Sequence, residues 1–324
     1  MKILFLGVEG SLSPWYDDFL EAISGRYPVT LFDPTQPIAE QFKGVEVVVA
    51  QSTSFGTHKM IDAAASARVK LWQVYTTGLD KVDVAYYQKK GVPLANTPGQ
   101  FSAVGLAEHA LFLMLCFTKN LAASQKNARS KIWNLPVNEE LEGKTLGIIG
   151  LGSSGRELAR LTHALKMKVI AVDIADIPLA IRHEFGVELL GGPEHLDQLL
   201  TAADYVSIHT PLTSDTQHMI DARALQLMKP TAVLINVARG EIVDQAALIE
   251  ALQTGQIKGA GLDTCAGEPL EPDHPLLRLD NVIVTPHVAG VTTGTSRRRA
   301  HAAAENIERL AGNLPLQHLV TASG

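Results

Sequence analysis

The amino-acid sequence predicts an α/β protein with two doubly wound parallel-sheet domains, and three observations carry this prediction. Over about the first 100 residues, short β-rich segments alternate with helical patterns. A glycine-rich turn between two apolar strands lies near the middle of the 324-residue chain. After this turn, strands and helices alternate again. Such alternation is typical of parallel sheets with helices on both faces.

The N-terminal part has the strand and helix signals of one doubly wound unit. The predicted strands are 2–6, 29–32, 45–49, 70–74 and 92–95, and the predicted helices are 17–23, 59–67 and 84–90. The segment from Asn96 to Gly99 contains turn-forming residues and ends this unit. A long apolar helix at 103–120 and a polar arm containing Trp133 follow.

The central motif occupies residues 143–173. An apolar strand at 145–149 leads into Gly150, Gly152 and Gly155, which open an amphipathic helix. Gly150 permits a tight turn, and Gly152 lets the backbone approach a pyrophosphate. Gly155 lets the helix pack closely on the strand. In this strand, turn and helix setting, the pattern predicts dinucleotide binding rather than a purely structural βαβ turn.

The residues around this motif indicate which dinucleotide binds. Ser153 and Ser154 begin the helix, whose free N–H groups and dipole favour phosphate. The next strand, 169–172, ends at Asp173, about 20 residues after the first glycine, where an acid can bind the adenine ribose hydroxyls. Its carboxylate repels a 2′-phosphate, and no arginine follows it. The sequence therefore favours NAD over NADP.

Beyond this motif, further strands are predicted at 205–208, 232–236, 259–262 and 282–284. The last helix, 293–311, is separated from these strands, so we expect it to pack back on the N-terminal unit. We therefore expect a domain of residues 1–99 plus 288–324 and a nucleotide-binding domain of residues 100–287.

Composition excludes several classes of function. The formal net charge of −6 gives no general attraction for nucleic acid or an anionic membrane. No apolar run is long enough for a membrane span, and no cleavable leader is recognisable at the N-terminus. Cys116 and Cys265 are far apart and lack metal-ligand spacing, so neither a disulfide scaffold nor a metal site is expected. We expect a cytoplasmic location.

The catalytic candidates follow the ends of predicted strands. Ligands of open parallel sheets bind beyond the carboxyl ends of the strands. The segments at those ends are His209-Thr210-Pro211, Arg239-Gly240, 263–268 and His287. An arginine, a carboxylate and a histidine are thus expected at one edge of one sheet.

These three side chains suit hydride transfer to a 2-oxo acid. Arg239 can pair bidentately with a carboxylate, and His287 can donate a proton to a ketone oxygen or accept one in the reverse direction. Glu268 can bind the other imidazole nitrogen, which fixes the tautomer and raises the histidine pKa. Taken alone, each residue is more often structural: a surface cation or helix-capping partner, a turn acid and a turn histidine. Their joint placement favours function.

Other conspicuous residues are interpreted as structural. His109 is predicted to be a satisfied core or interface histidine, and residues 297–299, three consecutive arginines, a solvated helix face. Trp133 is predicted to anchor the arm or an interface, with a role in the wall of a substrate site as the alternative. Trp15 and Tyr16 are either packing residues or part of a substrate pocket.

The sequence resembles the D-2-hydroxyacid dehydrogenase family over nearly its whole length. The segments that carry the resemblance are TTGLDKVD from Thr76, GVPLANTPG from Gly91, SAVGLAEHALFLML from Ser102, LEGKTLGIIGLGSSGRELA from Leu141, SIHTPLT from Ser207, LINVARGEIVDQAAL from Leu234, GAGLDTCAGEP from Gly259 and TPHVAG from Thr285. The resemblance implies a Rossmann NAD-binding domain and a flavodoxin-like substrate domain.

The resemblance also implies roles for particular residues. It makes Arg239, Glu268 and His287 the catalytic set and lets the backbone at Thr77 and Gly78 help to hold the substrate carboxylate. The implied cofactor-binding residues, with Asp263 on the nicotinamide carboxamide, are Gly150, Gly152, Ser153, Ser154, Gly155, Asp173, Thr210, Pro211, Val237, Ala238, Asp263 and His287. Family members are commonly homodimers, in which a helix and arm corresponding to 102–140 contact the partner.

Departures from the family pattern concern the substrate more than the reaction. Cys265 and Ala266 replace an aromatic and a larger residue, and 290–295 is an unusual version of its segment. Glu268 disfavours the formate-oxidising branch, where a glutamine is found. No C-terminal regulatory extension of the long phosphoglycerate dehydrogenases is recognisable.

We therefore expect an NAD(H)-linked oxidoreductase for a small D-2-hydroxy acid or 2-oxo acid, with glyoxylate and hydroxypyruvate as first candidates. One alternative is an NADH-sensing interaction protein of the corepressor type, which keeps this fold and catalytic set. Others are a phosphoglycerate-type dehydrogenase and a different two-unit NAD-dependent fold of the alanine dehydrogenase type.

Overall fold

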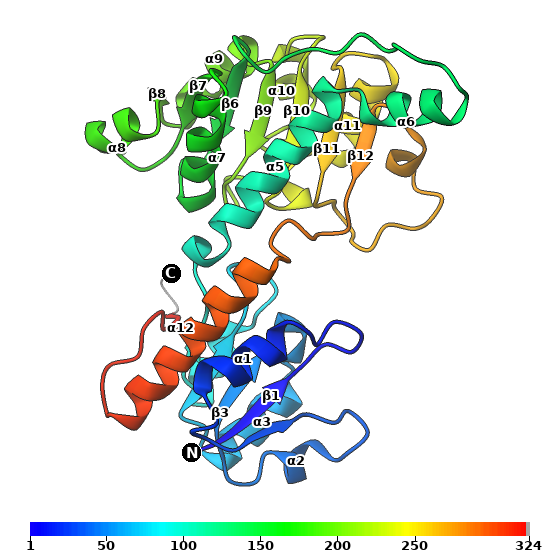
Figure 1. Cartoon of the computed structure of the whole chain (residues 1–324). Helices are drawn as coiled ribbons and strands as arrows, with labels where there is room; N and C mark the ends of the chain where they lie inside the picture. Colours follow the sequence, from blue (N-terminus) through cyan, green and yellow to red (C-terminus); the bar gives the residue numbers. More distant parts are fainter. Residues whose placement is uncertain (322–324) are drawn as a thin grey trace. The chain divides into compact units, whose positions relative to one another are not determined.

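Two parallel sheets organise the polypeptide, and each is the centre of a separate unit (Figure 1). The structure is a computed structural model that describes residues 1–321. The smaller unit comprises residues 1–102 and 292–321, and the larger unit comprises Ala103–Val291. The predicted α/β class with doubly wound parallel sheets is confirmed.

The unit boundaries lie a few residues beyond the predicted ones, which follow residues 99 and 287. At the first crossing, Arg298 Nε donates to the carbonyl of Phe101 at 2.8 Å and holds that segment in the smaller unit. At the second crossing, the amides of Val288 and Ala289 donate to the Asp263 carboxylate. The turn after residue 287 therefore stays with the larger unit.

The smaller sheet has the strand order β2-β1-β3-β4-β5, all parallel. Its strands are β1 (Lys2–Leu6), β2 (Val29–Leu31), β3 (Val45–Ala50), β4 (Leu71–Val74) and β5 (Leu94–Ala95). The helices of this unit are α1 (Trp15–Ile23), α2 (Ile38–Gln41), α3 (His58–Ala67), α4 (Val84–Lys89) and α12 (Thr293–Ala311), with 3₁₀ turns η1 (Thr53–Phe55) and η2 (Gly99–Phe101).

Each face of this sheet has its own apolar core. On one face, α3 and α4 pack Ile61 and Tyr87 against Trp72. On the other, α1 and α12 contribute Phe19 and Ile307 to a core shared with the sheet, and the two helices run side by side in Figure 1. The expectation that the last helix packs on the N-terminal unit is thus met by α12.

The larger sheet has seven parallel strands in the order β12-β11-β10-β9-β6-β7-β8 within the described residues. They are β6 (Thr145–Ile149), β7 (Lys168–Val172), β8 (Val187–Gly191), β9 (Tyr205–Ile208), β10 (Val233–Asn236), β11 (Gly259–Leu262) and β12 (Val282–Val284). The chain proceeds outward from β6 in one direction and then from β9 in the other. The loops after these two neighbouring strands diverge, which leaves room for a ligand.

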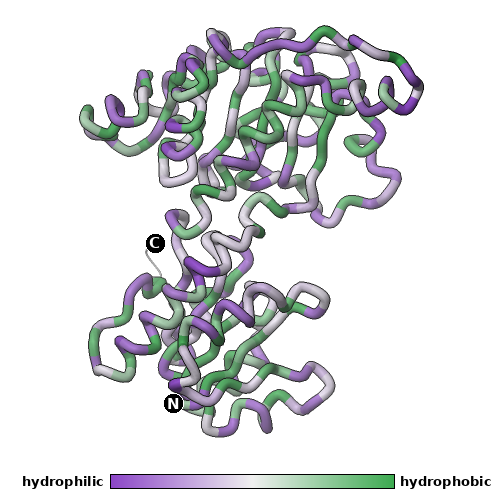
Figure 2. The backbone as a smooth tube through the Cα atoms, in the orientation of Figure 1, coloured by the Kyte–Doolittle hydropathy of each residue, from purple (hydrophilic) through white to green (hydrophobic). Residues whose placement is uncertain are grey.

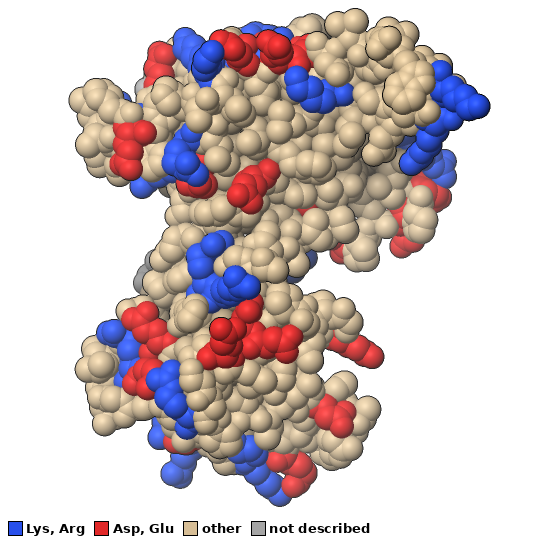
Figure 3. Space-filling view, in the orientation of Figure 1, with Lys and Arg blue, Asp and Glu red and all other residues tan. Residues whose placement is uncertain are grey.

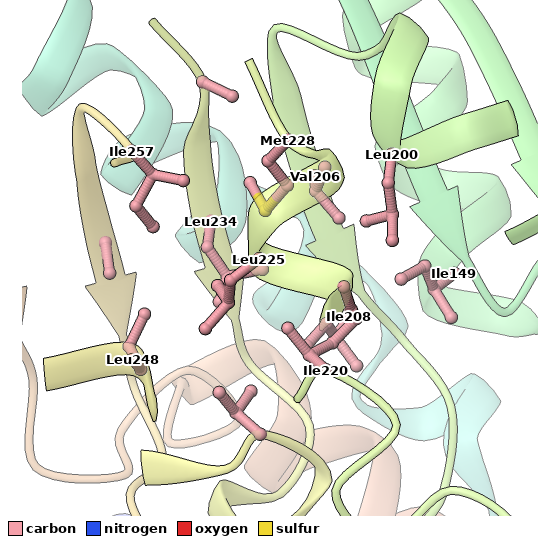
Figure 4. Close-up of a cluster of buried hydrophobic side chains, with 14 of the residues drawn as sticks. Ile149, Leu200, Val206, Ile208, Ile220, Leu225, Met228, Leu234, Leu248 and Ile257 are labelled. Carbon is pink, nitrogen blue, oxygen red and sulfur yellow. The ribbon is translucent and has the colours of Figure 1, made fainter. Parts of the chain in front are cut away.

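Helices cover both faces of the larger sheet. They are α5 (Ala103–Thr118), α6 (Leu121–Arg129), α7 (Ser153–Ala164), α8 (Leu179–Glu184), α9 (Leu196–Ala202), α10 (Ala222–Leu227) and α11 (Gln245–Gln253), with 3₁₀ turns η3 (Pro193–His195), η4 (Gly240–Ile242) and η5 (Pro275–Arg278). The helices α5 and α7 pack on one face. The other face packs on α9, α10 and α11 through the cluster around Leu225 and Leu234 in Figure 4.

Burial on both faces explains why the central strands are continuous apolar segments. The strands β9, β10 and β11 are buried at every position, and the hydrophobic tracts in Figure 2 follow the strands of both sheets. At about 25 cal/mol per Å² of buried apolar surface, these cores supply the main stabilising contribution to the fold.

Three elements depart from the sequence-based prediction. The short helix α2 and the strand β8 were not predicted, and the first part of the predicted polar arm forms α6. Within residues 1–321 no single helix is long and apolar enough to cross a membrane. The helices α5 and α6 pass that test only as a pair bent by 54°, and much of α5 is buried in the larger unit.

Candidate active site

The turn between β6 and α7 has the geometry that its glycines predict. Gly150 has φ +93°, and a Cβ there would lie 2.8 Å from the His209 carbonyl carbon. A Cβ on Gly155 would lie 2.2 Å from the oxygen of Gly150. A Cβ on Gly152, by contrast, would meet nothing within 4 Å. Two glycines are therefore required by the protein itself, whereas the third leaves open space beside the helix.

The N-terminus of α7 is available to an anion. Gly152 is its N-cap residue and supplies no side-chain cap, so the first N–H groups of α7 keep their donors for a ligand. Ser154 Oγ instead lies 3.0 Å from His209 Nδ1, and His209 Nε2 lies 2.9 Å from Ser207 Oγ. Burial lowers the pKa of His209 to about 4. This imidazole is neutral near pH 7 and links the turn to β9.

A pocket of about 170 Å³ opens beside this turn and has the character of a nucleoside site. It is lined by Ile149, Gly150, Val172, Asp173, Ile174, Pro193, Leu196, Thr210, Asp215, Thr216 and Met219. The carboxylate of Asp173 accepts from the amides of Leu151 at 2.6 Å and Ala175 at 2.7 Å. Apolar walls and an acid at the end of β7 fit an adenosine group, and the open helix terminus fits its pyrophosphate.

Other predicted cofactor-binding residues lie on the loops at the same edge of the sheet. Thr210 lines the pocket, and the carbonyl of Pro211 accepts from Thr216 Oγ1 at 2.7 Å. Val237 and Ala238 follow β10 and are buried. The predicted roles of these four residues stay predictions.

The predicted acid and base candidates form a hydrogen-bonded pair. His287 Nδ1 lies 2.8 Å from Glu268 Oε2, and the other oxygen of Glu268 accepts from the amide of Cys265 at 2.7 Å. The His287 side chain is 48% exposed, whereas that of Glu268 is 28% exposed. Glu268 therefore holds one imidazole nitrogen, and the imidazole remains accessible to a small molecule.

Asp263 fixes the backbone that carries His287. The side chain of Asp263 is buried, and its carboxylate accepts from Thr285 Oγ1 and from the amides of Val288 and Ala289 at 2.6 to 2.9 Å. The His287 amide donates to the Asp263 carbonyl. His287 itself has φ +55°, which is uncommon outside glycine. Asp263 thus holds the turn in shape, while its predicted carboxamide contact stays a prediction.

His109 on α5 completes this support. Its Nε2 lies 2.8 Å from Thr285 Oγ1 and 3.4 Å from Asp263 Oδ1. Burial lowers the His109 pKa, and the nearby Asp263 charge partly offsets this. The sequence interpretation made His109 a satisfied core or interface histidine. The structure also places His109 behind the turn of His287. The sequence feature that could have indicated this support is a histidine in a largely apolar helix.

Arg239 is the N-cap residue of η4 and lies three residues beyond the end of β10. Its carbonyl accepts from Asn236 Nδ2, and its own Nη1 donates to the Ala238 carbonyl, both at 2.8 Å. The next residue, Gly240, packs so closely on the loop before Glu268 that a Cβ would lie 1.9 Å from the carbonyl carbon of Cys265. The segments that carry Arg239 and Glu268 are therefore adjacent, as the strand-end rule predicts.

The loop at 264–268 differs from the family pattern in sequence but is firmly held. The side-chain amide of Gln245 on α11 makes two bonds to the backbone of Ala266. Its Oε1 accepts from the Ala266 amide at 2.9 Å, and its Nε2 donates to the Ala266 carbonyl at 3.3 Å. Cys265 is buried, and this burial raises the pKa of its thiol to about 12. Cys265 is therefore a packing residue in this structure rather than a thiolate nucleophile.

In the smaller unit, Thr77 and Gly78 lie in the turn after β4. Thr77 Oγ1 donates to the Thr97 carbonyl at 3.1 Å, and Asn96 Nδ2 donates to the Thr77 carbonyl at 3.0 Å. Trp15 is buried in this unit's core. The predicted substrate-binding role of Thr77 and Gly78 stays a prediction.

The prediction of a solvated face for the three arginines is wrong for two of them. Arg298 donates to the Phe101 carbonyl, and Arg299 donates to the Tyr75 carbonyl at 2.6 Å. Only Arg297 is a largely exposed side chain. Their helix packs on α1, a contact that local sequence does not reveal.

Charges and metal-binding groups are unremarkable elsewhere. Basic and acidic side chains are interspersed on the face drawn in Figure 3. Within residues 1–321, no group of three or more His, Cys, Asp or Glu side chains is placed to hold a metal ion. Both cysteines are free thiols.

Comparison with known proteins decides the family. Residues 111–289, more than half of the chain, match the family described as D-isomer specific 2-hydroxyacid dehydrogenase, NAD binding domain. The chain belongs to this family. Its predicted class, an NAD-dependent oxidoreductase of the D-2-hydroxyacid dehydrogenases, is thereby confirmed, and so is NAD as the cofactor.

Individual members of the family are similar over most of their length. A glyoxylate reductase of Thermofilum pendens is 38% identical over 79% of this chain and 76% of its own. A hydroxypyruvate reductase of Thermotoga maritima is 36% identical over 79% and 81%, respectively. The NAD-complexed structure of a D-isomer specific 2-hydroxyacid dehydrogenase from Lactobacillus delbrueckii ssp. bulgaricus has a TM-score of 0.82 at 27% identity, covering 99% of this chain and 100% of that chain.

Proposed function

We propose that this dehydrogenase interconverts a small 2-oxo acid and its D-2-hydroxy acid, with glyoxylate or hydroxypyruvate as the substrate. The observation that carries the proposal is the 2.8 Å pair of His287 and Glu268, on the same unit as the nucleotide pocket. The names of the two relatives described above, a glyoxylate reductase and a hydroxypyruvate reductase, support this choice of substrate.

Each residue of the proposed catalytic set has a separate task. NADH, when bound, supplies the hydride that adds to C2 of the 2-oxo acid. His287 gives a proton from Nε2 to the substrate oxygen, because Nδ1 is held by Glu268. The negative charge of Glu268 stabilises the imidazolium that must be present before this transfer. Arg239 binds the substrate carboxylate with its planar guanidinium.

We further propose that NAD is used in preference to NADP. Two acids, Asp173 and Asp215, line the nucleoside pocket, and no lysine or arginine is among its lining residues. A 2′-phosphate in this pocket would lose its hydration next to like charges. The ribose hydroxyls of NAD, in contrast, can donate to a carboxylate.

The remaining predictions concern the state of the protein in the cell. We propose a homodimer formed through α5, α6 and the arm that follows them. That surface carries exposed apolar side chains, including Trp133 and Val137. A cytoplasmic location stays a prediction from composition.

Turnover tests the proposed reaction. Purified protein with NADH is mixed with glyoxylate, hydroxypyruvate, pyruvate and 3-phosphohydroxypyruvate in turn, and the loss of absorbance at about 340 nm is followed. We expect glyoxylate or hydroxypyruvate to give the highest kcat/KM. If no acid in the panel is reduced, the proposal is wrong, and NADH-dependent binding of a protein partner becomes the better explanation.

A His287→Ala variant separates chemistry from binding. We expect kcat to fall by about 10²-fold or more, because the proton donor is lost, while the NADH Kd stays the same. NADH fluorescence measures that Kd without turnover. A variant with undiminished kcat would exclude His287 as the proton donor.

A further inference from the structure

One cation in the smaller unit has no counterion. Arg299 projects from α12 towards the turn after β4, where Nη1 donates to the Tyr75 carbonyl at 2.6 Å and Nη2 lies 3.5 Å from Thr77 Oγ1. Its guanidinium carbon lies 5.8 Å from the ring centroid of Trp15. Within residues 1–321, no carboxylate lies within ion-pair distance of this guanidinium.

Arg299 is half-buried, and part of its guanidinium has no partner among the described residues. Its Nε atom is buried and donates to no described group. Burial lowers the Arg299 pKa to about 10, so the side chain is still a cation at neutral pH. A partly buried charge without a counterion costs desolvation free energy unless something compensates it. The Trp15 face and two neutral acceptors compensate only part of this cost.

The turn beside Arg299 presents donors rather than acceptors. The carbonyls of Thr76, Thr77 and Gly78 accept bonds from Thr97, Asn96 and Thr76, in that order. The amides of Thr77 and Gly78 donate to no group within residues 1–321. Free amides next to an uncompensated guanidinium create a positive potential, which favours a small anion.

We propose that Arg299 is a positioning residue for a carboxylate subsite at Thr77 and Gly78. This inference rests on the proposed function, because the anion it assigns is the carboxylate of a small 2-oxo acid. Arg299 acts in two ways: it fixes the turn through Tyr75 and Thr77, and its charge attracts the carboxylate.

Two substitutions separate these actions. Arg299→Gln keeps a donor for the Tyr75 carbonyl but removes the charge, whereas Arg299→Lys keeps the charge without the planar fork. Arg297→Gln is the matched control, because Arg297 lies on the same helix, its side chain is 71% exposed, and its ion pair at 3.9 Å is with Asp18 on α1 rather than with the turn. Thermal denaturation of each variant identifies any that fail to fold.

The readouts are KM and kcat for glyoxylate, together with the Kd of oxamate, an unreactive 2-oxo acid mimic, for the enzyme with NADH bound. For Arg299→Gln we expect KM and the oxamate Kd to rise by about tenfold, which corresponds to ~1.4 kcal/mol. We expect kcat and the NADH Kd to change less than about twofold. Arg299→Lys should recover part of the oxamate affinity, and Arg297→Gln should match the wild type.

The possible failures are distinguishable. An Arg299→Gln variant with wild-type KM and oxamate Kd would overturn the inference and leave the proposed reaction intact. A fall in kcat or Tm without weaker oxamate binding would also overturn it, because it would make Arg299 purely structural. A wild-type enzyme that reduces no 2-oxo acid would contradict the proposed function itself, and its oxamate Kd would still report on the subsite.

Discussion

A histidine that transfers protons needs a fixed tautomer and a fixed direction, and separate neighbours supply them here. Glu268 binds Nδ1, while the Asp263 carboxylate and the Asp263 carbonyl hold the backbone on both sides of His287. His109 in turn contacts the Asp263 network from α5. The proposed catalytic histidine is thus positioned by residues that themselves never need to touch the substrate.

Removing the charge of Glu268 tests the first of these contacts. In Glu268→Gln we expect kcat at neutral pH to fall by about 10- to 100-fold, because the imidazolium loses its stabilising partner. The NADH Kd, measured by fluorescence, should not change. Glu271→Gln, an exposed acid of the same loop, is the control. Equal kcat in both variants would contradict the role of Glu268.

Substitution of His109 tests the support that α5 gives to the turn of His287. His109→Leu removes the bond to Thr285, so we expect kcat to fall by about tenfold with an unchanged NADH Kd. His109→Gln, which keeps a donor near Thr285 Oγ1, should recover much of this loss. If His109→Leu has full kcat, the turn of His287 does not depend on α5.

The lowered pKa of His209 leads to a prediction of how the stability of the protein depends on pH. Its folded pKa of about 4 lies below the value of about 6.5 expected in the unfolded chain. Between these two pH values the unfolded state binds one more proton than the folded state. The contribution of His209 to stability is therefore complete above about pH 6.5 and is lost as the pH falls towards 4. We expect His209→Gln to flatten the pH profile of Tm in this window. His301→Gln, at an exposed position, should keep the wild-type profile.

At the scale of elements, the glycines at the junction of β6 and α7 have different roles: some are required by the fold, and one leaves space for a ligand. A Cβ on Gly155 collides with a backbone oxygen, whereas a Cβ on Gly152 meets no protein atom. The backbone of Gly152 is also extended, with φ −72°, so alanine fits it without strain. One substitution should therefore change folding and the other binding.

We expect Gly155→Ala to lower Tm by about 5 °C or more, because the collision costs at least ~1 to 3 kcal/mol. Gly152→Ala should keep the wild-type Tm and raise the NADH Kd by about tenfold, because its methyl group occupies the space predicted for the pyrophosphate. Calorimetry and fluorescence titration measure the two effects. Similar NADH affinity in Gly152→Ala and wild type would contradict the assigned phosphate site.

The elements that could be predicted from sequence are those with a strong local signal. Central parallel strands are uninterrupted apolar segments because both faces are buried, and β9 and β11 have the predicted bounds. The strand β8 was not predicted because it is an edge strand that contains Glu188 and ends at Gly191. The helix α6 was missed because its exposed, polar residues carry no apolar stripe.

In the candidate site, too, the residues with a clear local sequence signal could be predicted and the others could not. Arg239, Glu268 and His287 could be proposed from sequence because each follows a recognisable strand. The support from His109 and the contact of Arg299 with the Tyr75 carbonyl could not, since both depend on elements far apart in the chain. Local pattern identifies an apolar helix or a basic one, but it does not identify what the helix packs against.

At the scale of the whole molecule, α5, α6 and the arm that follows them carry several exposed apolar side chains. Phe112 and Leu121 on the helices and Ile132, Leu135 and Val137 on the arm are exposed, and the side chain of Trp133 is 75% exposed. Several exposed apolar side chains on consecutive segments are typical of an interaction site. These side chains support the proposed homodimer.

We expect the wild-type protein to sediment as a dimer and the double variant Phe112→Glu, Val137→Glu to sediment as a monomer, because buried unpaired charges oppose association. Leu314→Glu, at an exposed apolar position of the smaller unit, should leave the dimer intact. Analytical ultracentrifugation at several concentrations measures both. A monomeric wild type would contradict the proposed assembly.

The order of the two units along the chain has a consequence for biosynthesis. Residues 103–291 form the larger unit as one uninterrupted stretch, whereas the smaller unit needs α12 to cover the sheet face that carries Phe5 and Val49. The N-terminal strands are synthesised before the larger unit, and α12 is synthesised after it. The nucleotide-binding unit can therefore fold as soon as its own residues are made, whereas the smaller unit keeps an apolar sheet face uncovered until α12 has been synthesised.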